Sequence, residues 1–428
     1  MQSKNDQSMK KWFFLLILFA ETVSAQTINQ LSLSQAYDLA QKNYPVIKQK
    51  DLVKQTEDLT IENLRKGYLP QPAVSGQATY QSDVTGIDIS LPGVNIQSPA
   101  KDQYKVLADV NQVVYDGGLI KQQQKATQLN TEVEEQKIEV ELYKLKDRIN
   151  EIYLGVLFLD EQIKQADLIK QDIQVGIKQV EAQVINGVVL KSNLNVLKAQ
   201  LLQTDQRVIE LKASRKGLIE TLGLFLDQQL AENIVLEKPV ISSTPSNEIS
   251  RPELKLYSDQ SKLIQQQNKL VTAKNLPKAS LFAQGGYGRP GLNLLKNEFD
   301  WFYIAGVRFN WPLGGLYTLK KEKQLNEVNR KIIDVQKETF LLNTNTQLKQ
   351  QHCEIDKYDQ LVETDKAIID LRVHVKEAAV AQLQNGVITA NDYLREVNAE
   401  DQARQSLITH QIQLLQAEIN YQTMLGKQ

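Results

Sequence analysis

Hydrophobic residues recur at alternating steps of four and three from Ile138 to Ala166, the core of an uninterrupted stretch that is predicted to be helical from Gly118 to Ile185. An average step of about 3.5 residues is typical of α-helices in a left-handed coiled coil. The stretch contains no proline, and at about 1.5 Å per residue it would form a helix about 100 Å long. The residues of the predicted seam are Ile138, Leu142, Leu145, Ile149, Ile152, Val156, Leu159, Ile163 and Ala166.

A complete succession of elements is predicted twice along the chain. A helix from Leu31 to Lys66, restarted at Pro45, leads into two strands of alternating polarity, the long helix and a return helix. A second succession of the same kind begins at Arg251-Pro252-Glu253-Leu254. We therefore expect a first repeat at 26–226 (strands at about 73–82 and 104–115, helical hairpin 117–226), a linker or equatorial insert at 227–250, and a second repeat at 251–428 (strands at about 278–288 and 301–311, helical hairpin 314–426).

Short motifs recur at corresponding places about 200 residues apart, which supports an internal duplication. Each Asn-Gly motif predicts the turn of a helical hairpin, because glycine tolerates the positive φ that a tight turn requires. The matching motifs are Tyr115-Asp116-Gly117-Gly118-Leu119 with Pro312-Leu313-Gly314-Gly315-Leu316, Asn186-Gly187-Val188-Val189 with Asn385-Gly386-Val387-Ile388, Gly67-Tyr68-Leu69-Pro70 with Lys274-Asn275-Leu276-Pro277, and Leu222-Gly223 with Leu425-Gly426.

The strand expected at 301–311 combines an apolar face with aromatic residues at both ends. This arrangement is typical of a lipid-facing transmembrane β-strand, and about ten tilted residues cross the hydrocarbon layer. A half-buried strand of a soluble protein would also alternate, so the interpretation depends on the four strands together with an export signal. Arg308 and Asn310 lie on the polar face, and the apolar face carries Trp301, Tyr303, Ala305, Val307, Phe309 and Trp311.

The first residues of the chain predict that export signal. Lys10 and Lys11 precede a short apolar run, and Val23-Ser24-Ala25 has the small residues of a cleavage site, so we expect a signal peptide at 1–25. An N-terminal membrane anchor is the alternative, but the apolar run is too short to span a bilayer. The single cysteine, Cys353, leaves the exported chain without an internal disulfide.

Four strands in lipid require partners. An open sheet would leave unpaired backbone groups in hydrocarbon, each costing several kcal/mol, and a closed barrel requires about eight strands or more. We therefore expect several copies of the chain to share one barrel. Two copies would supply eight strands and three would supply twelve, and the sequence pattern does not choose between them.

Composition and motifs argue against other classes of function. The formal net charge of −1 argues against a nucleic-acid-binding protein, which usually carries a basic patch. Residues Gly286 to Gly291 have the glycine spacing of a dinucleotide-binding motif. That motif requires a helix directly after it, whereas the next residues here predict a loop between strands. The histidines at 352, 374 and 410 lack metal-ligand spacing, and no nucleophile motif stands out. We expect no cofactor, no metal site and no enzymatic activity.

The duplicated unit, the Gly-Gly junctions, the Arg-Pro-Glu-Leu opening and the two Asn-Gly turns together resemble the TolC family of outer-membrane channel proteins, from about Leu31 to Leu425. The resemblance implies a membrane protein with an all-α part and a β-barrel. It implies a homotrimer with a twelve-stranded barrel in the outer membrane, continued by a twelve-helix coiled-coil tunnel in the periplasm. It also implies the exit duct of a tripartite efflux pump or a type I secretion system. The implied partners are a periplasmic adaptor (membrane fusion) protein and an inner-membrane pump of the RND, ABC or MFS type.

The resemblance further implies functional residues at the turns. Adaptor contacts correspond to Gly187, Val188, Val189, Gly386, Val387 and Ile388, and the acidic ring of the periplasmic gate corresponds to Asp392. Arg395 stands where relatives can carry a second aspartate, and Ser192 and Asn193 occupy the corresponding place after the first turn.

Three alternatives stay open. The turns could lack a partner, and Asp392 could be a residue that the helix dipole favours near a helix start. The whole chain could also be a periplasmic coiled-coil adaptor or structural protein. Such a protein would not need amphipathic strands with aromatic ends.

Overall fold

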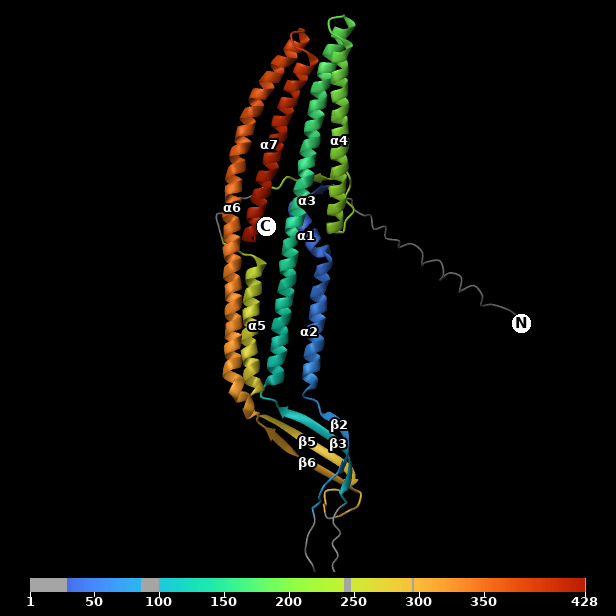
Figure 1. Cartoon of the computed structure of the whole chain (residues 1–428), viewed down its shortest axis with the longest axis vertical. Coiled ribbons are helices and arrows are strands. Elements are labelled where there is room, and N and C mark those ends of the chain that lie inside the picture. Colours follow the sequence, from blue (N-terminus) through green and yellow to red (C-terminus); the bar gives the residue numbers. More distant parts are fainter. Residues whose placement is uncertain (1–28, 86–99, 242–247, 295, 428) are drawn as a thin grey trace, which may run out of the picture. The chain divides into compact units, whose positions relative to one another are not determined.

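The computed structural model describes residues 29–85, 100–241, 248–294 and 296–427 (Figure 1). The expected signal peptide at 1–25 lies outside these residues. The chain forms two compact units, and both draw on the two halves of the sequence. Unit 1 is Met1–Ala40, Ile149–Val240 and Thr364–Ile412, and unit 2 is Gln41–Arg148, Ile241–Glu363 and Gln413–Gln428.

Unit 2 contains a four-stranded antiparallel sheet. Its strands are β2 (Gln71–Tyr80), β3 (Asp102–Tyr115), β5 (Lys278–Arg289) and β6 (Asp300–Asn310). They are hydrogen-bonded in the order β2-β3-β5-β6, so β2 and β6 are the edges. All four overlap the strand ranges expected from the sequence. Periodicity does not reveal the order, which pairs the second strand of one succession with the first strand of the next.

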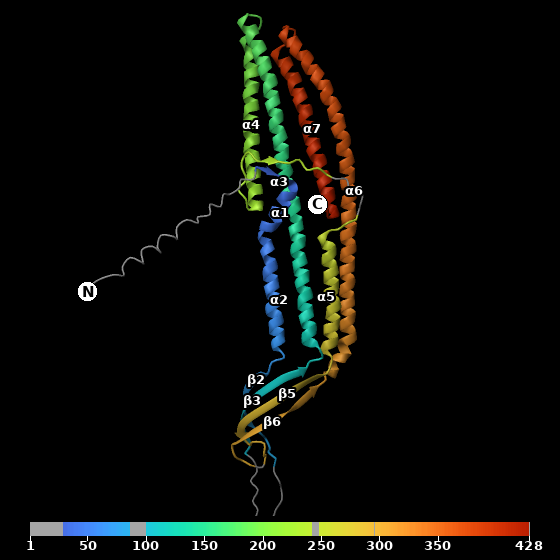
Figure 2. The same ribbon diagram turned by 180° about the vertical axis from the view of Figure 1, so that it is seen from behind.

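Each strand of this sheet joins a helix of unit 2. Helix α2 (Lys48–Lys66) precedes β2, α5 (Pro252–Lys274) precedes β5, α3 (Leu119–Ile185) follows β3, and α6 (Leu316–Gln384) follows β6. Pro45 begins a 3₁₀ turn, Pro45–Ile47, at the place where the sequence predicts a restart. Within unit 2, α2 and α6 lie at opposite sides, with α5 and the first part of α3 between them (Figures 1 and 2).

Unit 1 contains α1 (Leu33–Asn43) up to Ala40, α4 (Lys191–Leu226), most of α7 (Ala390–Leu425), and the second parts of α3 and α6. A two-residue strand β1 (Gln30–Leu31) pairs in parallel with β4 (Val235–Leu236). The sequence pattern predicts a helix that includes Leu31 and an irregular segment at 227–250, so this pairing differs from the expectation. Tyr153 explains it, since its hydroxyl oxygen lies 2.7 Å from the carbonyl oxygens of both Leu31 and Glu237.

The coiled-coil seam predicted along α3 lies largely inside the protein. Ile138, Leu142, Leu145, Ile149, Val156 and Ala166 are buried, and Ile152, Leu159 and Ile163 are half-buried. Apolar burial of this kind contributes roughly 25 cal/mol per Å², which is the main force that holds the long helix against its neighbours. Among the described residues, no helix combines the length and the hydrophobicity needed to cross a lipid bilayer.

The junction between β3 and α3 depends on two glycines in the left-handed region. Gly117 has φ +72° and Gly118 has φ +77°. The Asp116 carboxylate accepts hydrogen bonds from the Gly118 N–H (2.8 Å) and the Ile120 N–H (2.7 Å), which satisfies donors at the start of α3. The two glycines differ in their surroundings. A Cβ on Gly117 would lie 2.7 Å from Leu276 Cβ, whereas nothing lies within 4 Å of one on Gly118.

We therefore predict that Gly117→Ala destabilises the protein more than Gly118→Ala does. Both substitutions place a side chain at positive φ, which costs about 1–2 kcal/mol. Only Gly117→Ala adds a clash with Leu276, so its thermal midpoint should fall well below that of Gly118→Ala. Circular dichroism melts of the two purified variants measure the difference. Equal midpoints would show that the contact with Leu276 is unimportant.

Candidate functional sites

The first candidate site is one face of the β-sheet in unit 2. Directly opposed residues of an antiparallel pair share a face, so the register assigns both faces residue by residue. One face, called here the apolar face, crosses all four strands, and its two charged residues, Asp102 and Arg289, pair with each other at one end, level with Tyr80 and Tyr104. Its large side chains are Val74, Tyr80, Tyr104, Val106, Val110, Leu281, Tyr287, Trp301, Tyr303, Val307 and Phe309.

The apolar face is exposed throughout this chain. Trp301 is 77% exposed and Tyr303 is 82% exposed. Trp311, expected on the same strand face, lies just past β6, and its indole N–H donates to the Asn275 carbonyl oxygen at 3.2 Å. A contiguous exposed apolar surface of this extent marks a contact with lipid or with another protein.

The opposite face of the sheet is mainly polar. The Gln284 amide donates to the Asp109 carboxylate at 2.5 Å, and the Arg308 guanidinium lies 4.7 Å from the centre of the Phe282 ring. The register also shows a bulge that alternation alone does not predict: pairing shifts between Val113 and Tyr115, so Tyr115 lies opposite Ala279. Because the shift comes at the end of β3, the faces stay separate along the rest of the strand.

The second candidate site comprises the two helical turns of unit 1, called here the first turn (after α3) and the second turn (after α6). Both have the same backbone. The N–H groups of Gly187 and Val188 donate to the carbonyl oxygens of Val184 (3.1 Å) and Gln183 (2.8 Å). Gly386 and Val387 donate to Leu383 (3.1 Å) and Gln382 (2.8 Å) in the same way. These are Schellman motifs, and each glycine has the positive φ that such a motif needs.

The six turn residues differ in exposure. Val188 is 65% exposed and Val387 is 71% exposed, and a Cβ on Gly187 or Gly386 would meet nothing within 4 Å. Val189 and Ile388, by contrast, pack partly against the hydrophobic core of unit 1. One valine of each turn is therefore available to a partner, and the next residue anchors the turn.

A glutamine connects the two turns. The Gln183 amide donates to the Leu383 carbonyl oxygen at 2.7 Å and approaches that of Gln384 at 3.3 Å. These carbonyls belong to the last turn of α6, where backbone acceptors lack helical partners. The role of Gln183 is not predictable from the sequence, because the local pattern gives no sign of a contact with a segment about 200 residues away.

The candidate gate residues Asp392 and Arg395 are engaged with their own helix. The Asp392 carboxylate accepts from the Thr389 hydroxyl (2.7 Å) and the Thr389 N–H (3.1 Å), and the Thr389 oxygen accepts from the Asp392 N–H (3.2 Å). This reciprocal cap lowers the pKa of Asp392, and Arg395 at 3.6 Å adds to the effect. At the start of α4, Ser192 is exposed and Asn193 half-buried, and the cap residue Leu190 offers no side-chain acceptor.

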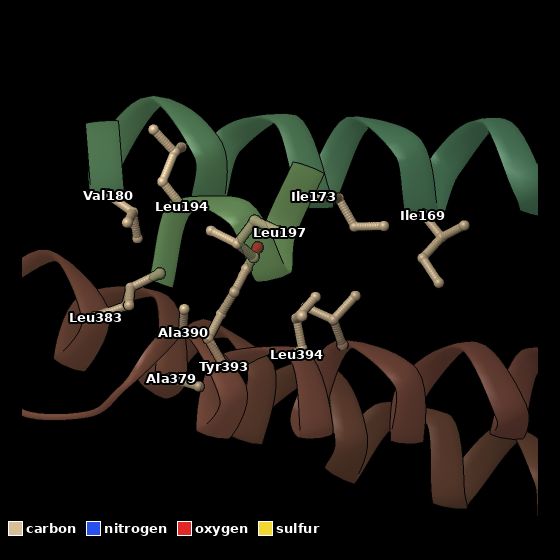
Figure 3. Close-up of a cluster of buried hydrophobic side chains, with 11 residues drawn as sticks. Ile169, Ile173, Val180, Leu194, Leu197, Ala379, Leu383, Ala390, Tyr393 and Leu394 are labelled. Atoms are coloured by element: carbon tan, nitrogen blue, oxygen red, sulfur yellow. The ribbon is translucent and has the colours of Figure 1, made fainter. Parts of the chain in front are cut away.

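The hydrophobic core of unit 1 lies next to these turns and joins four helix segments (Figure 3). Tyr393 of α7 reaches across it toward α3 and α4 and is only 1% exposed. Its hydroxyl donates to the Asp172 carbonyl oxygen at 2.7 Å. Its ring lies against Gly176, where a Cβ would come within 2.5 Å of Tyr393 Cε1. Glycine at 176 therefore allows α3 and α7 to approach closely.

An ionic cluster adjoins Tyr393, and of its four side chains Glu400 is buried while Asp172, Lys376 and Arg404 are half-buried. Lys376 Nζ lies 2.9 Å from both the Asp172 and the Glu400 carboxylates, and Arg404 Nε lies 2.7 Å from Glu400. Burial opposes the charge on Glu400, but the hydrogen bonds from Lys376 and Arg404 outweigh it and lower the pKa of Glu400. The same carboxylates overcome burial at Lys376 and raise its pKa. The cluster thus ties α3, α6 and α7 together in unit 1.

No arrangement for metal binding accompanies these sites. Across the described residues, no group of three or more His, Cys, Asp or Glu side chains could hold a metal ion. Cys353 is exposed, and His410 Nδ1 lies 2.6 Å from the Asp365 carboxylate.

Comparisons with known proteins identify the fold. No protein-family model matches the sequence, and no curated protein matches it. Among solved structures, the chain is similar to the CusC transmembrane channel, with a TM-score of 0.66, 15% identity, and 92% of each chain covered. It is also similar to the open MtrE outer-membrane channel of Neisseria gonorrhoeae, with a TM-score of 0.65 and 12% identity over 92% of this chain and 89% of MtrE.

A third similarity is to the CmeC outer-membrane channel of Campylobacter jejuni, with a TM-score of 0.63 and 14% identity over 92% of this chain and 85% of CmeC. The resemblance predicted from the sequence is thus confirmed for the fold. The chain has the fold of TolC-like outer-membrane channels.

We predict that acid loosens the contact between α3 and α7. Because the pKa of Glu400 lies below its ordinary value, its ionised form contributes stability above about pH 4.3, and this stability is lost as the pH falls through the lowered pKa. Amide hydrogen exchange at 397–404, which lies more than a helical turn beyond the Asp392 cap, should therefore accelerate between about pH 7 and about pH 3 once it is corrected for intrinsic rates.

Glu400→Gln should flatten this pH dependence, because the titrating carboxyl is removed. Glu377→Gln is the matched control, since Glu377 is exposed and pairs only loosely with His374 at 3.5 Å. If amide exchange in Glu400→Gln keeps the same pH dependence, a titrating group other than Glu400 is responsible for it.

Proposed function

We propose that the protein is an outer-membrane channel that conducts substrates passively from the periplasm to the exterior, as the exit duct of a tripartite efflux pump or a type I secretion system. The observation that carries the proposal is the apolar face, which crosses four strands and ends in aromatic residues. Lipid is the environment that suits such a face. A periplasmic adaptor or structural protein would have no use for it.

The two edges of the sheet support a shared barrel. β2 and β6 each have one unpaired side in this chain, and unpaired backbone groups in hydrocarbon cost several kcal/mol each. Copies of the chain remove both edges if β6 of one copy pairs with β2 of the next. Three copies then form a twelve-stranded barrel. The resemblance to the TolC family implies three copies, and the shared fold supports this number, so we propose a homotrimer.

The helices of unit 2 support the same head-to-tail contact. α6 carries an exposed apolar stripe at steps of three, four and seven, and α2 carries exposed Leu52 and Leu59 at a step of seven. Since α6 follows the β6 edge and α2 precedes the β2 edge, one contact would cover both stripes. A head-to-tail contact that closes on itself produces a ring. The stripe on α6 comprises Leu325, Val328, Ile332, Val335 and Leu342.

The helical hairpins would then form a periplasmic tunnel that ends at the two turns. Gly187, Val188 and Val189, with Gly386, Val387 and Ile388, would meet a periplasmic adaptor, which recruits an inner-membrane pump of the RND, ABC or MFS type. The channel supplies no energy and performs no enzymatic reaction. Its lipid contact is made by Trp301, Tyr303, Val307, Phe309 and Trp311.

Opening would take place at the turns. Tyr393 and the Lys376 cluster hold α7 against α3, so widening the mouth requires these contacts to break or to move together. Asp392, Arg395, Ser192 and Asn193 would surround the mouth. Because Arg395 lies 3.6 Å from Asp392 and 3.0 Å from Glu396, it offsets part of the acidic charge of the gate within each copy.

The first prediction tests the lipid contact. Ala305 lies midway along β6 on the apolar face, and Ile304 lies next to it on the opposite face. Arginine at the bilayer midplane costs about 2–4 kcal/mol on a lipid-facing position. Ala305→Arg should therefore deplete the protein from purified outer membranes, and Ile304→Arg should not. Equal recovery of the two variants would contradict the proposal.

The second prediction tests the contact between copies. Val335 belongs to the exposed stripe on α6, and Gln336 is its exposed polar neighbour. Burying an aspartate at the contact would leave a desolvated charge, so Val335→Asp should abolish the trimer on semi-native gels. Gln336→Asp should keep it. Persistence of the trimer in Val335→Asp would exclude the α6 stripe from the interface.

A further inference from the structure

The two helical turns share one backbone but differ in their side chains. Ile185, Leu190 and Lys191 of the first turn correspond to Gln384, Thr389 and Ala390 of the second turn. Ile185 is 79% exposed and Leu190 is 75% exposed, in addition to the exposed Val188. We call Ile185, Val188 and Leu190 the first-turn patch. The second turn exposes only Val387 among its large apolar side chains.

The conformation of the turn does not require this exposure. In a Schellman motif the residue after the glycine is often apolar and packs against the third or fourth residue from the helix end. In the first turn, the corresponding residue is Gln183, whose amide is directed to the Leu383 carbonyl oxygen instead. Val188 is left outside. One exposed apolar side chain is ordinary, but three together at 185–190 mark a contact surface.

The electrostatics of the turns differ as well. From Ala182 to Leu197 the only charged residue is Lys191, and it forms no ion pair among the described residues. The next lysine, Lys198, lies 3.5 Å from Glu181. In the corresponding stretch of the second turn, 381–396, Arg395 lies 3.0 Å from the Glu396 carboxylate and 3.6 Å from the Asp392 carboxylate. The first turn is therefore apolar with one uncompensated positive charge, whereas the corresponding stretch of the second turn carries two carboxylates and one guanidinium.

We propose that the two turns are not equivalent, and that the first-turn patch is the principal docking point for a protein partner that presents an apolar surface bordered by carboxylates. This inference rests on the proposed function, which supplies the periplasmic position and the need for a partner. The three apolar side chains of the patch are buried against the apolar surface of the partner. The positive charge of Lys191 favours a partner whose apolar surface is bordered by carboxylates over one bordered by basic side chains. The second turn contributes only Val387 to the contact with the partner. Its Thr389 and Asp392 mainly cap the start of α7.

The test uses the purified full-length protein and two probes of known composition. Each probe is a designed trimeric helical bundle, labelled for fluorescence anisotropy, whose exposed end displays leucines bordered by glutamates (acidic probe) or by lysines (basic probe). Three linked ends raise the effective concentration and bring a weak contact into a measurable range. We expect the acidic probe to bind at least about 10-fold more tightly than the basic probe.

Matched variants locate the contact. Val188→Thr and Val387→Thr make the same change in the two turns. We expect at least about a 5-fold loss of acidic-probe affinity for the first and less than about 2-fold for the second. Ile185→Gln with Leu190→Thr places the second-turn residues in the first turn and should weaken binding at least about 10-fold. Lys191→Glu should reverse the preference toward the basic probe.

Several outcomes would overturn the inference. Equal losses in Val188→Thr and Val387→Thr would make the turns equivalent, and equal binding of both probes, or of neither, would remove the acidic partner. Sedimentation velocity without a probe could show pairs of trimers that the Ile185→Gln, Leu190→Thr variant separates, which would assign the patch to a second copy. Binding of phosphatidylglycerol vesicles that the same variant abolishes would assign it to lipid.

The proposed function fails by a different measurement. Outer-membrane fractionation and the trimer test on Val335→Asp do not involve the turns. If the protein is absent from the outer membrane, the proposed channel function is refuted. The probe affinities of Val188→Thr and Val387→Thr would still show whether the two turns are equivalent. A trimer in the outer membrane whose two turns respond alike would refute only the inference.

Discussion

The pairing of backbone N–H and C=O groups in the β-sheet is the constraint on which the rest of the structure depends. A four-stranded sheet with a continuous apolar face can pair its two inner strands, but its edge strands β2 and β6 stay half-satisfied. In water such edges bind solvent, and in hydrocarbon they bind nothing. Once the apolar face is assigned to lipid, a closed arrangement of several copies follows from the backbone alone. The exposed stripe on α6 is then the helical counterpart of the unpaired β6 edge.

Much of the fold is predictable from the sequence, because its elements are long and strongly periodic. The seam of α3 follows a heptad pattern, and the Asn-Gly motifs at 186–187 and 385–386 mark turns whose glycines have positive φ. The alternation in 301–311 separates Tyr303 from Arg308 on opposite faces, as the register of β6 shows. Each of these features is local, so a short window of sequence contains the information.

The remaining features depend on contacts between distant segments. The β1–β4 pair forms because Tyr153 of α3 binds the carbonyls of Leu31 and Glu237, which no local pattern announces. The strand order β2-β3-β5-β6 joins the two halves of the chain, and the ionic cluster joins Asp172 to Lys376. At the turns, the pattern of Val188 and Val189 looks uniform, yet only Val188 is well exposed. Burial of this kind depends on tertiary packing.

If the channel opens at its turns as proposed, the cluster around Lys376 places charged groups at the end of a helical hairpin that would have to move. A buried ion pair contributes little net stability, because the cost of desolvation offsets most of the attraction, but it favours one arrangement of the helices over others. Asp172, Lys376 and Glu400 can therefore fix the register between α3, α6 and α7 without adding much to the free energy of separating them. An apolar core of the same size would resist separation more strongly, since exposing it to water costs roughly 25 cal/mol per Å². In a channel that opens at its turns, the apolar residues would supply cohesion and the ionic cluster would set the position to which the closed state returns.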